Sequence, residues 1–345
     1  MNDFSASLIA WFKASSRDLP WRKTRDPYAI LVSELMLQQT QVTTVIDYFE
    51  RWMTRFPDVR TLADAAEANV LRMWEGLGYY ARARHLHRAA KAIVQAGGRF
   101  PSTLDEIRAL PGVGPYTAGA VASFAFGIRA PMVDANIARV IARLRNIRRP
   151  IDSSAGQKLV WQQAESMLPI DGERARAHNG ALMELGATLC KPGEPPCRHC
   201  PVKRWCHATD PATLPAKEPR RATIELEENC GWILHQGRVL LETSNSPRGR
   251  GMWRLPVMAA PARRSPIHES HYPFTHHRVH LRVFPGERPA RIRKNQRWTE
   301  IARLSETAMT APHRRALTSL LDLDVVRRKL VPPRTGGSRR VPVVR

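Results

Sequence analysis

Acidic charge and long apolar runs are both scarce in this sequence. The 345 residues include 54 lysines and arginines but only 31 acidic residues, which leaves a formal net charge of +23. No stretch is long and apolar enough to span a bilayer, and residues 1–22 lack the charged start and apolar core of a secretory signal. We therefore expect a cytoplasmic protein without a membrane partner. Because basic residues recur in both halves, we also expect a polyanionic partner, for which nucleic acid is the natural candidate.

Cysteine is scarce as well, with five residues in the chain. Four of them follow the pattern C-x6-C-x2-C-x5-C, a crowding that in a cytosolic protein favours metal ligation over a disulfide framework. Four thiolates this close can bind a tetrahedral zinc ion or an iron–sulfur cube, and the spacing alone does not choose between them. Cys230 stands apart and is expected in a core. The four candidate ligands are Cys190, Cys197, Cys200 and Cys206.

Strand-like alternation is rare before residue 214, where apolar residues recur at helical spacing. This part is predicted to be all-α, with helices over 3–13, 28–42, 45–55, 62–65, 68–74, 82–95, 102–109, 135–147 and 159–167 and one more that opens at Pro115. A Pro-containing linker at 214–220 leads to a mixed α+β region. Its expected elements are strands at 222–226, 230–234, 239–242 and 279–284, a turn at Gln236-Gly237, and a helix near 313–323. Residues 325–345 read as a basic, solvated tail that attracts nucleic acid.

A glycine turn joins two expected helices in the middle of the all-α part. Ser102 is the expected N-cap of the first helix, and Pro115 suits the first turn of the second because its φ is fixed and its N–H is missing. The free N–H groups of Gly112, Val113 and Gly114 are expected to face outward and to suit a phosphate oxygen, whatever the base sequence. This pattern predicts a helix-hairpin-helix motif.

Asp134 precedes a basic helical segment and has two candidate roles. The common one is the N-cap of that helix. The other is a carboxylate held close to a bound phosphate and facing a reacting sugar. The residues around it leave both roles open.

A phosphate-binding hairpin followed by such an aspartate resembles the helix-hairpin-helix DNA glycosylase superfamily. Within it the sequence is similar to the adenine DNA glycosylase (MutY) family over nearly the whole chain. The motifs that carry the resemblance are the hairpin, Pro20-Trp21-Arg22, Ser33-Glu34-Leu35-Met36-Leu37-Gln38-Gln39-Thr40-Gln41-Val42 and Gly76-Leu77-Gly78-Tyr79-Tyr80. The resemblance implies a mainly α helix-hairpin-helix glycosylase domain at 1–213 with an iron–sulfur loop at 190–206, followed by an α+β Nudix (MutT)-like domain at 221–324.

The resemblance also implies a cofactor and partners. The four crowded cysteines look like the loop of the endonuclease III and adenine glycosylase families, which selects one [4Fe–4S] cluster. The expected partner is double-stranded DNA that holds adenine mispaired with 8-oxoguanine or guanine. A monomer is expected to bind it, and the abasic product would pass to downstream abasic-site repair enzymes.

Two carboxylates are assigned to the glycosidic bond by this resemblance. Glu34 matches the family's catalytic glutamate, and on an apolar helix face its pKa should be raised, so that it can protonate adenine N7 and help activate the attacking water. Asp134 matches the aspartate that stays ionised and stabilises an oxocarbenium-like sugar, and Asn136 matches the residue that supports it by hydrogen bonding. Tyr116 stands where lyase relatives carry lysine, which implies a monofunctional glycosylase. Its phenol is expected to bond to Asp134 or to stabilise the intermediate, unless it is simply a helix-face aromatic.

Further positions match residues that handle an extruded base. Gln39 and Tyr79 match family residues that wedge into the base stack, and a core aromatic is the alternative for Tyr79. Thr40 belongs to the same stretch as Gln39. Trp21 has ordinary packing as its alternative role. The residues that resemble the adenine pocket are Arg17, Leu19, Trp21, Arg22 and Leu37.

Two positions depart from the family pattern. Gly180 lies where relatives often carry Gln or Glu, which removes a polar contact near the base. Ala138 replaces a lysine found in some members. The acid pair is intact, so these changes concern contacts and affinity rather than chemistry.

The C-terminal resemblance to MutT rests on residues 232–234, 239–242 and 251–256 and lacks the glutamate-rich metal box of a hydrolase. This domain is therefore expected to bind rather than to hydrolyse. Residues 272–277 match a Phe-Ser-His loop that contacts 8-oxoguanine in the family. The expected contacts are Phe274, Thr275 and His276, and Thr275 keeps a hydroxyl for the N7–H and O8 edge. An ordinary surface histidine is the alternative for His276 and His277.

Taken together, these features predict a monofunctional adenine DNA glycosylase of base excision repair. The nearest rival is an endonuclease III-like glycosylase and lyase, against which Tyr116, Glu34 and the C-terminal domain argue. A rival of another class is a noncatalytic iron–sulfur protein that marks DNA lesions. The presence of both Glu34 and Asp134 argues against this second rival.

Overall fold

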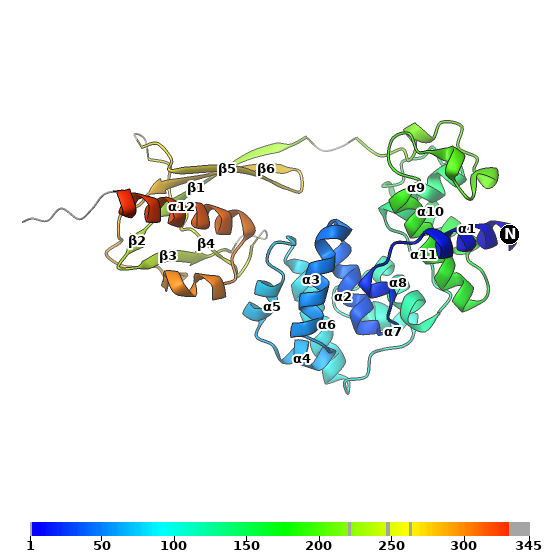
Figure 1. Cartoon of the computed structure of the whole chain (residues 1–345), viewed down its shortest axis with the longest axis horizontal. Coiled ribbons are helices and arrows are strands. Elements are labelled where there is room, and N and C mark those ends of the chain that lie inside the picture. The colour runs from blue at the N-terminus through cyan, green and yellow to red at the C-terminus, as the bar shows by residue number, and fades with distance from the viewer. Residues whose placement is uncertain (1, 220–221, 246–248, 262–263, 331–345) are drawn as a thin grey trace, which may run out of the picture. The chain divides into compact units, whose positions relative to one another are not determined.

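The computed structural model of the protein describes residues 2–219, 222–245, 249–261 and 264–330. The chain forms two compact units, Met1–Arg221 and Ala222–Arg345 (Figure 1). Each unit has a buried core of its own. The break between them falls next to the expected linker at 214–220.

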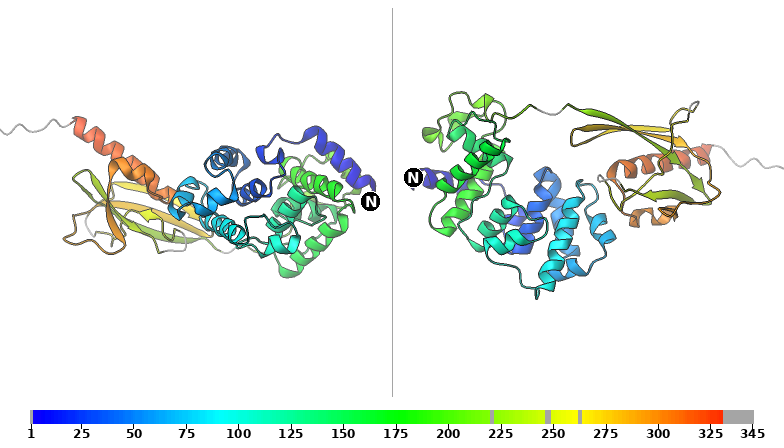
Figure 2. Two further views of the ribbon diagram at one scale, coloured as in Figure 1. Left: turned by 90° about the horizontal axis from the view of Figure 1, so that it is seen from below. Right: turned by 180° about the vertical axis from the view of Figure 1, so that it is seen from behind.

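The described part of the first unit is helical, which confirms the predicted fold class. Helices α1, α9, α10 and α11 surround one core, while α2 to α8 form the other half of the unit (Figure 2). The helices are α1 (Asn2–Ser15), α2 (Pro27–Leu37), α3 (Val42–Arg55), α4 (Val59–Asp64), α5 (Glu67–Met73), α6 (Ala81–Gln95), α7 (Leu104–Ala109), α8 (Pro115–Phe126), α9 (Ala135–Leu144), α10 (Ser154–Met167) and α11 (Gly172–Thr188). Short 3₁₀ turns cover Pro20–Arg22, Cys197–His199, Lys203–Trp205 and Pro211–Thr213.

Helix α2 is buried along most of its length, from Tyr28 to Met36. Asp26 caps it by accepting a hydrogen bond from the Tyr28 N–H, and Pro27 occupies the first turn, where a missing N–H costs nothing. The Tyr28 hydroxyl donates to the Phe56 carbonyl at 2.8 Å and so ties α2 to the end of α3. Because α2 packs against α8, its buried face meets the helix that follows the glycine turn.

The single helix expected over 28–42 is two helices in the structure. Helix α2 ends at Leu37, and Val42 begins α3 instead of continuing α2. The break lies at Gln39, whose φ of 56° is left-handed and incompatible with a continuing α-helix.

Several helix ends and one whole helix also differ from the expectation, and α4 and α10 begin earlier than expected, at Val59 and Ser154. Thr103, not Ser102, caps α7, and it forms a reciprocal capping box with Glu106. Helix α9 ends at Leu144 rather than at 147. Helix α11 has no counterpart among the expected helices, because its buried face includes polar residues and glycines that hide the apolar period.

The second unit combines two small sheets with helix α12 (Ala311–Leu330) (Figure 1). In the first sheet β6 lies between β1 and β5, parallel to β1 and antiparallel to β5. In the second, β3 pairs with β2, β4 and β7, each antiparallel. The strands are β1 (Ile224–Trp232), β2 (Leu234–His235), β3 (Arg238–Thr243), β4 (Trp253–Arg254), β5 (His268–Phe274), β6 (His277–Pro285) and β7 (Gln296–Glu300).

Several expectations for the second unit are confirmed and others are corrected. The mixed α+β class is confirmed, Cys230 is fully buried, and Gln236 and Gly237 both have positive φ in the turn between β2 and β3. The strand expected at 222–226 and most of the one expected at 230–234 form a single strand, β1, while Leu234 belongs to β2. Strands β4, β5 and β7 were not expected. Helix α12 runs past the expected boundary at 324 to Leu330, because residues 325–330 contain no Pro or Gly to stop it. The rest of the expected tail lies outside the described residues.

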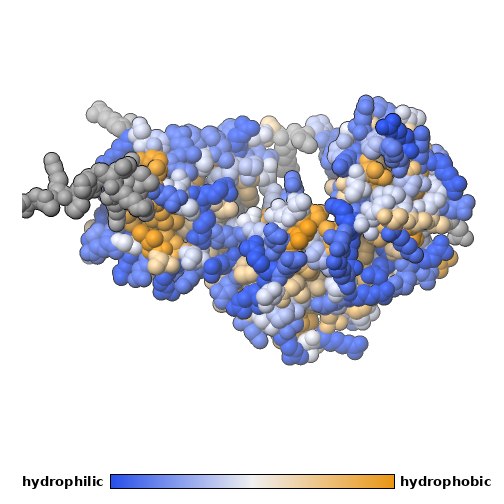
Figure 3. All heavy atoms as spheres, viewed as in Figure 1, coloured by the Kyte–Doolittle hydropathy of each residue, from blue (hydrophilic) through white to orange (hydrophobic). Residues whose placement is uncertain are grey.

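The outer surface reflects the composition. The face in Figure 3 is largely hydrophilic, with apolar side chains in small patches. None of the helices in the described part of the chain combines the length and apolarity needed to cross a bilayer.

Candidate active site and cysteine loop

Glu34 is a carboxyl group held out of water in the middle of α2. The residue is 3 % exposed, and the Tyr116 hydroxyl on α8 donates to its Oε2 at 2.6 Å. Burial raises the pKa of Glu34 to about 7, although the hydrogen bond from Tyr116 acts in the opposite direction. The nearby Asp134 raises this pKa further and Arg22 lowers it. Near neutral pH a carboxyl group with this pKa populates both its protonated and its ionised form. Such a group can therefore both donate and accept a proton. The partner of Tyr116 is therefore Glu34 and not Asp134, the partner expected from the sequence.

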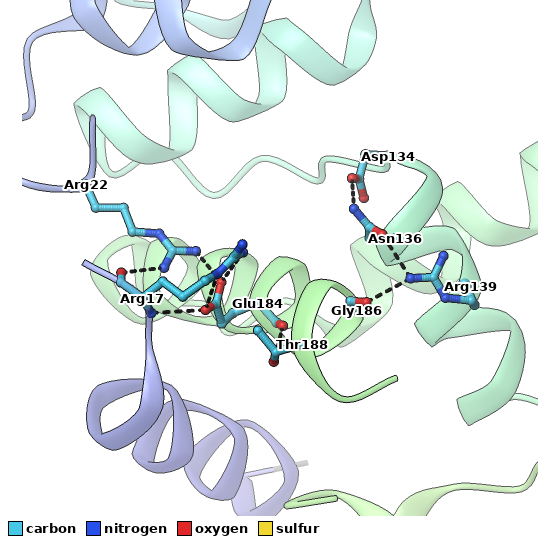
Figure 4. A network of polar contacts seen from close by, with 8 residues as sticks. All are labelled: Arg17, Arg22, Asp134, Asn136, Arg139, Glu184, Gly186 and Thr188. Carbon is cyan, nitrogen blue, oxygen red and sulfur yellow. Dashed lines mark hydrogen bonds and ion pairs between the residues drawn. The ribbon is translucent and has the colours of Figure 1, made fainter. Parts of the chain in front are cut away.

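Asp134 is the N-cap of α9, which confirms the common reading of this position. Its Oδ1 accepts the Ile137 N–H at 2.7 Å. Its Oδ2 accepts from Asn136 Nδ2 at 3.0 Å (Figure 4). Burial raises the pKa of Asp134, and the hydrogen bonds from Ile137 and Asn136 oppose that rise. Asp134 raises the pKa of Glu34, and both acids together with burial raise the pKa of the Tyr116 hydroxyl, so the two carboxyl groups act on the same site.

A cavity of about 970 Å³ opens beside Glu34, between α1, α2, α8, α11 and the segment that joins α1 to α2. Three of the five expected pocket residues line it, namely Arg17, Trp21 and Arg22. Leu19 does not, because its apolar side chain is buried in the core, and Leu37 at the end of α2 does not line it either. The volume is that of a site for a small molecule or a single base.

Glu184 on α11 holds two of these pocket residues and was missed by the sequence reasoning. Its fully buried carboxylate accepts from Arg17 Nε at 2.8 Å and Nη2 at 2.7 Å, and from Arg22 Nη2 at 2.7 Å (Figure 4). Burial alone would raise the pKa of Glu184, but the hydrogen bonds from Arg17 and Arg22 outweigh it and lower the pKa to about 2. The only signal in the sequence is an acidic residue among the apolar residues of 181–185, far from the arginines that it binds.

Gly180 faces the same cavity, one turn before Glu184 on α11. A Cβ at this position would approach ring atoms of Phe12 at 3.1 and 3.3 Å, so Phe12 occupies the space that a side chain would need. The Arg22 guanidinium lies 5.2 Å from the centroid of the same ring. The polar contact that this position lacks is thus replaced by an aromatic surface.

Gln39, Thr40 and Tyr79 do not line this cavity. Gln39 and Tyr79 are exposed, and both have left-handed backbones, with φ of 56° and 48°. Tyr79 is 39 % exposed, so the alternative of a core aromatic is wrong. Thr40 is half-buried, and its hydroxyl accepts from Arg82 Nη2 at 3.3 Å.

The glycine turn between α7 and α8 differs from the expectation in one donor. The Val113 N–H is not free, because it donates to the Leu110 carbonyl at 3.1 Å inside the turn. Gly112 has φ of 77°, and a Cβ there would lie 2.3 Å from His85, so glycine is required on both grounds. Among the described residues, no backbone carbonyl pairs with the N–H groups of Gly112 and Gly114 outside regular structure.

The four crowded cysteines line one small apolar cavity next to α9. Arg143 donates to Cys190 Sγ at 3.3 Å and to the Lys191 carbonyl at 2.7 Å. Burial raises the pKa of Cys200 to about 11, so that a thiolate there needs a bound cation. Four sulfur atoms around one cavity are a donor set that suits a bound metal centre.

Arg139 connects the cysteine loop to the surroundings of Asp134. It donates to Asn136 Oδ1 at 2.9 Å, to the Gly186 carbonyl at 2.8 Å and to the Cys190 carbonyl at 2.8 Å. Figure 4 shows the first part of this chain of contacts, from Asp134 through Asn136 to Arg139.

Comparison with known proteins agrees with this geometry. Residues 32–165 match the HhH-GPD superfamily of base excision DNA repair proteins. An adenine DNA glycosylase of Mycobacterium tuberculosis is 41% identical over 219 residues, which cover 62% of this chain and 70% of that protein. The chain belongs to the adenine DNA glycosylase family of the HhH-GPD superfamily. The superfamily match includes Glu34, Tyr116, Asp134 and the glycine turn, and it ends before the cysteine loop.

Other members and relatives cover the chain to different extents. An adenine DNA glycosylase of Rattus norvegicus is 45% identical over 252 residues, 70% of this chain and 48% of that protein. The chain spans about half the length of the mammalian adenine DNA glycosylases that it matches. Among solved structures, a thermostable thymine-DNA glycosylase is 32% identical, with a TM-score of 0.52, and covers 59% of this chain and 94% of its own.

The second unit of this family member carries the expected lesion contacts on a hairpin. Phe274 ends β5, and Thr275 follows with a φ of 53°, which is rare for a β-branched residue. The Thr275 hydroxyl lies 3.5 Å from His276 Nδ1 and 3.4 Å from His277 Nδ1. Thr275 is exposed at the turn between β5 and β6, whereas Phe274, His276 and His277 are half-buried.

Glu228, Cys230 and His313 also come within 4.8 Å of one another in the second unit. The polar atoms of Glu228 and His313 already have protein partners. Glu228 accepts from Arg254 at 2.9 Å and from Tyr272 at 2.6 Å, and His313 Nδ1 accepts the Leu255 N–H at 3.4 Å. We interpret this group as a buried polar network of the core.

Proposed function

We propose that the protein is a monofunctional adenine DNA glycosylase of base excision repair. It hydrolyses the bond between adenine and deoxyribose where the adenine is mispaired with 8-oxoguanine or guanine. The single observation that carries this proposal is the buried Glu34, poised near neutral pH at the edge of a base-sized cavity and close enough to Asp134 to feel its charge. The family relationship supports the same activity, since the relatives are named adenine DNA glycosylases.

The reaction follows from the two acids. Glu34 in its acid form donates its proton to adenine N7, the C1′–N9 bond breaks, and the bonding electron pair leaves with adenine. Asp134 in its base form faces the positive charge that develops on the sugar. Water then attacks C1′ and gives its proton to the Glu34 carboxylate, which restores the acid. Tyr116 donates to Glu34 and keeps its carboxyl group in place through the cycle.

The adenine pocket is made of Arg17, Trp21 and Arg22, held from behind by Glu184. Two cationic side chains at fixed positions can donate to the acceptor nitrogens of adenine, while the Trp21 ring offers an apolar wall. Gln39 and Tyr79 enter the base stack and keep the adenine extruded. Gly112 and Gly114 bind a phosphate of the strand through their N–H groups.

Cys190, Cys197, Cys200 and Cys206 would hold one [4Fe–4S] cluster. Such a cluster would cross-link the loop that follows α11. Lys203, Arg204 and His207 on the same loop would face the DNA backbone. In the second unit Phe274, Thr275 and His276 contact the 8-oxoguanine, whose N7–H can donate to the Thr275 hydroxyl.

A single-turnover assay tests this function. The substrate is a duplex with one adenine opposite 8-oxoguanine, and the proteins are the wild type, Glu34→Gln and Asp134→Asn. We expect strand breaks only after alkali treatment, and we expect them to disappear in Glu34→Gln, whose amide cannot donate a carboxyl proton. Breaks without alkali would identify a lyase. Tight binding without cleavage by the wild type would identify a protein that only marks lesions.

A further inference from the structure

Two exposed side chains of the first unit sit on strained backbone. Gln39 follows α2 and Tyr79 precedes α6, and their φ angles are 56° and 48°. For residues other than glycine, such a conformation costs about 1–3 kcal/mol and persists only where the surroundings enforce it. Neither residue owes its conformation to burial, since both are exposed. Something else in the fold must hold both segments in this form.

The guanidinium of Arg82, in the first turn of α6, contacts both segments at once. Its Nη1 donates to the carbonyls of Leu35 at 2.8 Å and Met36 at 2.9 Å, and also to that of Gln38. Its Nη2 donates to the carbonyl of Leu77 at 3.0 Å.

The same Nη2 group donates to the Gly78 carbonyl at 3.1 Å and to the Thr40 hydroxyl at 3.3 Å. Residues on both sides of Gln39, and the two residues before Tyr79, thus share one cation. Arg82 also lies over the Tyr79 ring, 5.6 Å from its centroid, and the residue is only 7 % exposed.

We propose that Arg82 is a positioning residue that locks Gln39 and Tyr79 into one rigid two-pronged wedge, so that the two side chains enter the DNA base stack together. This inference rests on the proposed function, because it gives Gln39 and Tyr79 their role in base extrusion. Arg82 itself touches neither base nor sugar. Its task is to make the position of one prong depend on that of the other.

The shape of the arginine side chain explains why this residue type is needed. A guanidinium offers separate N–H groups in a fixed plane, and here one terminal nitrogen serves the end of α2 while the other serves the turn before α6. A lysine ammonium is a single point donor and cannot reach both sets of carbonyls in the same geometry. Among the described residues no carboxylate forms an ion pair with Arg82, so carbonyl dipoles, including those at the C-terminal end of α2, balance its charge.

The test uses full-length protein and a duplex with 2-aminopurine in place of the adenine opposite 8-oxoguanine. This base fluoresces when it leaves the stack, so its signal reports extrusion separately from cleavage. We expect Arg82→Lys to slow extrusion by about tenfold or more, equivalent to the loss of about one charge-assisted hydrogen bond. Arg129→Lys is the matched control, because Arg129 also donates to two carbonyls, those of Glu165 and Pro169, but far from both prongs in the sequence.

A double-mutant cycle distinguishes positioning from general stability. In the wild type, Gln39→Ala and Tyr79→Ala should be strongly non-additive in extrusion rate, because the two prongs act as a unit. In the Arg82→Lys background their effects should become additive. Additive effects of the two substitutions in the wild type would overturn the proposal, even if Arg82→Lys failed to fold. A folded Arg82→Lys that extrudes the base at the wild-type rate would overturn it as well.

The same experiment separates this inference from the proposed function. If the wild type neither extrudes 2-aminopurine nor cleaves the adenine duplex, the proposed function fails. If the wild type does both, and Arg82→Lys matches it while Arg129→Lys is also unchanged, the role of Arg82 fails alone.

Discussion

The Glu184 carboxylate tests the reasoning about the pocket most directly, and Glu184→Gln is the smallest change that removes its charge. The carboxylate is fully buried and binds Arg17 and Arg22 at 2.7 Å. Its pKa of about 2 in the folded protein lies below the ordinary value of 4.5. At about 1.36 kcal/mol per pKa unit, the ionised form contributes on the order of 3 kcal/mol to the free energy of unfolding. Removing one partner of a buried ion pair costs a similar amount, about 3–5 kcal/mol.

The pH dependence has a definite sign. Because folding lowers the pKa of Glu184, its contribution is fully present above pH 4.5 and is lost as the pH falls towards 2. We therefore expect the difference in unfolding free energy between the wild type and Glu184→Gln to be about 3 kcal/mol at pH 7 and to shrink steadily between pH 4.5 and 2.

Urea denaturation followed by circular dichroism at a helix wavelength measures this difference, since helices dominate the first unit. Glu173→Gln is the control, because Glu173 binds Arg25 at 2.7 Å but both side chains are more than half exposed, at 55% and 57%. An exposed pair of this kind is worth about 1 kcal/mol or less. Equal destabilisation by the two variants, or a Glu184→Gln difference that persists unchanged at pH 2, would refute the reasoning.

Three further predictions concern the chemistry, the loop and the second unit. Because Glu34 must be protonated to act, we expect the single-turnover rate to fall as the pH rises through about 7. Tyr116→Phe removes a hydrogen bond that lowers the pKa of Glu34, so this fall should move to higher pH. A pH profile that stays in place or moves to lower pH would contradict the assignment. Cys200→Ala should lose iron and the visible absorption of the wild type, as measured by metal analysis and spectroscopy, while Cys230→Ala should keep both; retained iron in Cys200→Ala would exclude it as a ligand. Thr275→Val should weaken binding to an uncleavable adenine analogue opposite 8-oxoguanine by about tenfold but leave binding opposite guanine unchanged, and an equal loss opposite both bases would rule out a contact to the lesion.

Much of the site could be predicted from short stretches of sequence. The capping role of Asp134, its contact with Asn136 and the raised pKa of Glu34 all depend on neighbours within a few residues or on one apolar helix face. The glycine turn is equally local, since Gly112 must adopt a positive φ there. Such local features can be predicted because backbone geometry and helix periodicity directly restrict which residues occur at these positions.

Long-range partners could not be predicted in the same way. Tyr116 bonds to Glu34, 82 positions away, rather than to Asp134, and Glu184 binds arginines more than 160 positions away. Leu19 sits between two pocket residues in the sequence, yet it is buried in the core. In each case the outcome depends on which helices meet, and no single stretch contains that information.

The sequence by itself determined the helical class of the first unit, the mixed class of the second and the crowding of the four cysteines. These follow from residue type, periodicity and spacing along one chain segment. Only the tertiary structure decided that Tyr116 donates its hydrogen bond to Glu34 and that Glu184 binds the two pocket arginines. It also decided that one buried arginine, Arg82, joins the segments of Gln39 and Tyr79. The physical reason is that hydrogen bonds and ion pairs act over about 3 Å in space, whereas their partners lie tens to hundreds of residues apart in the chain.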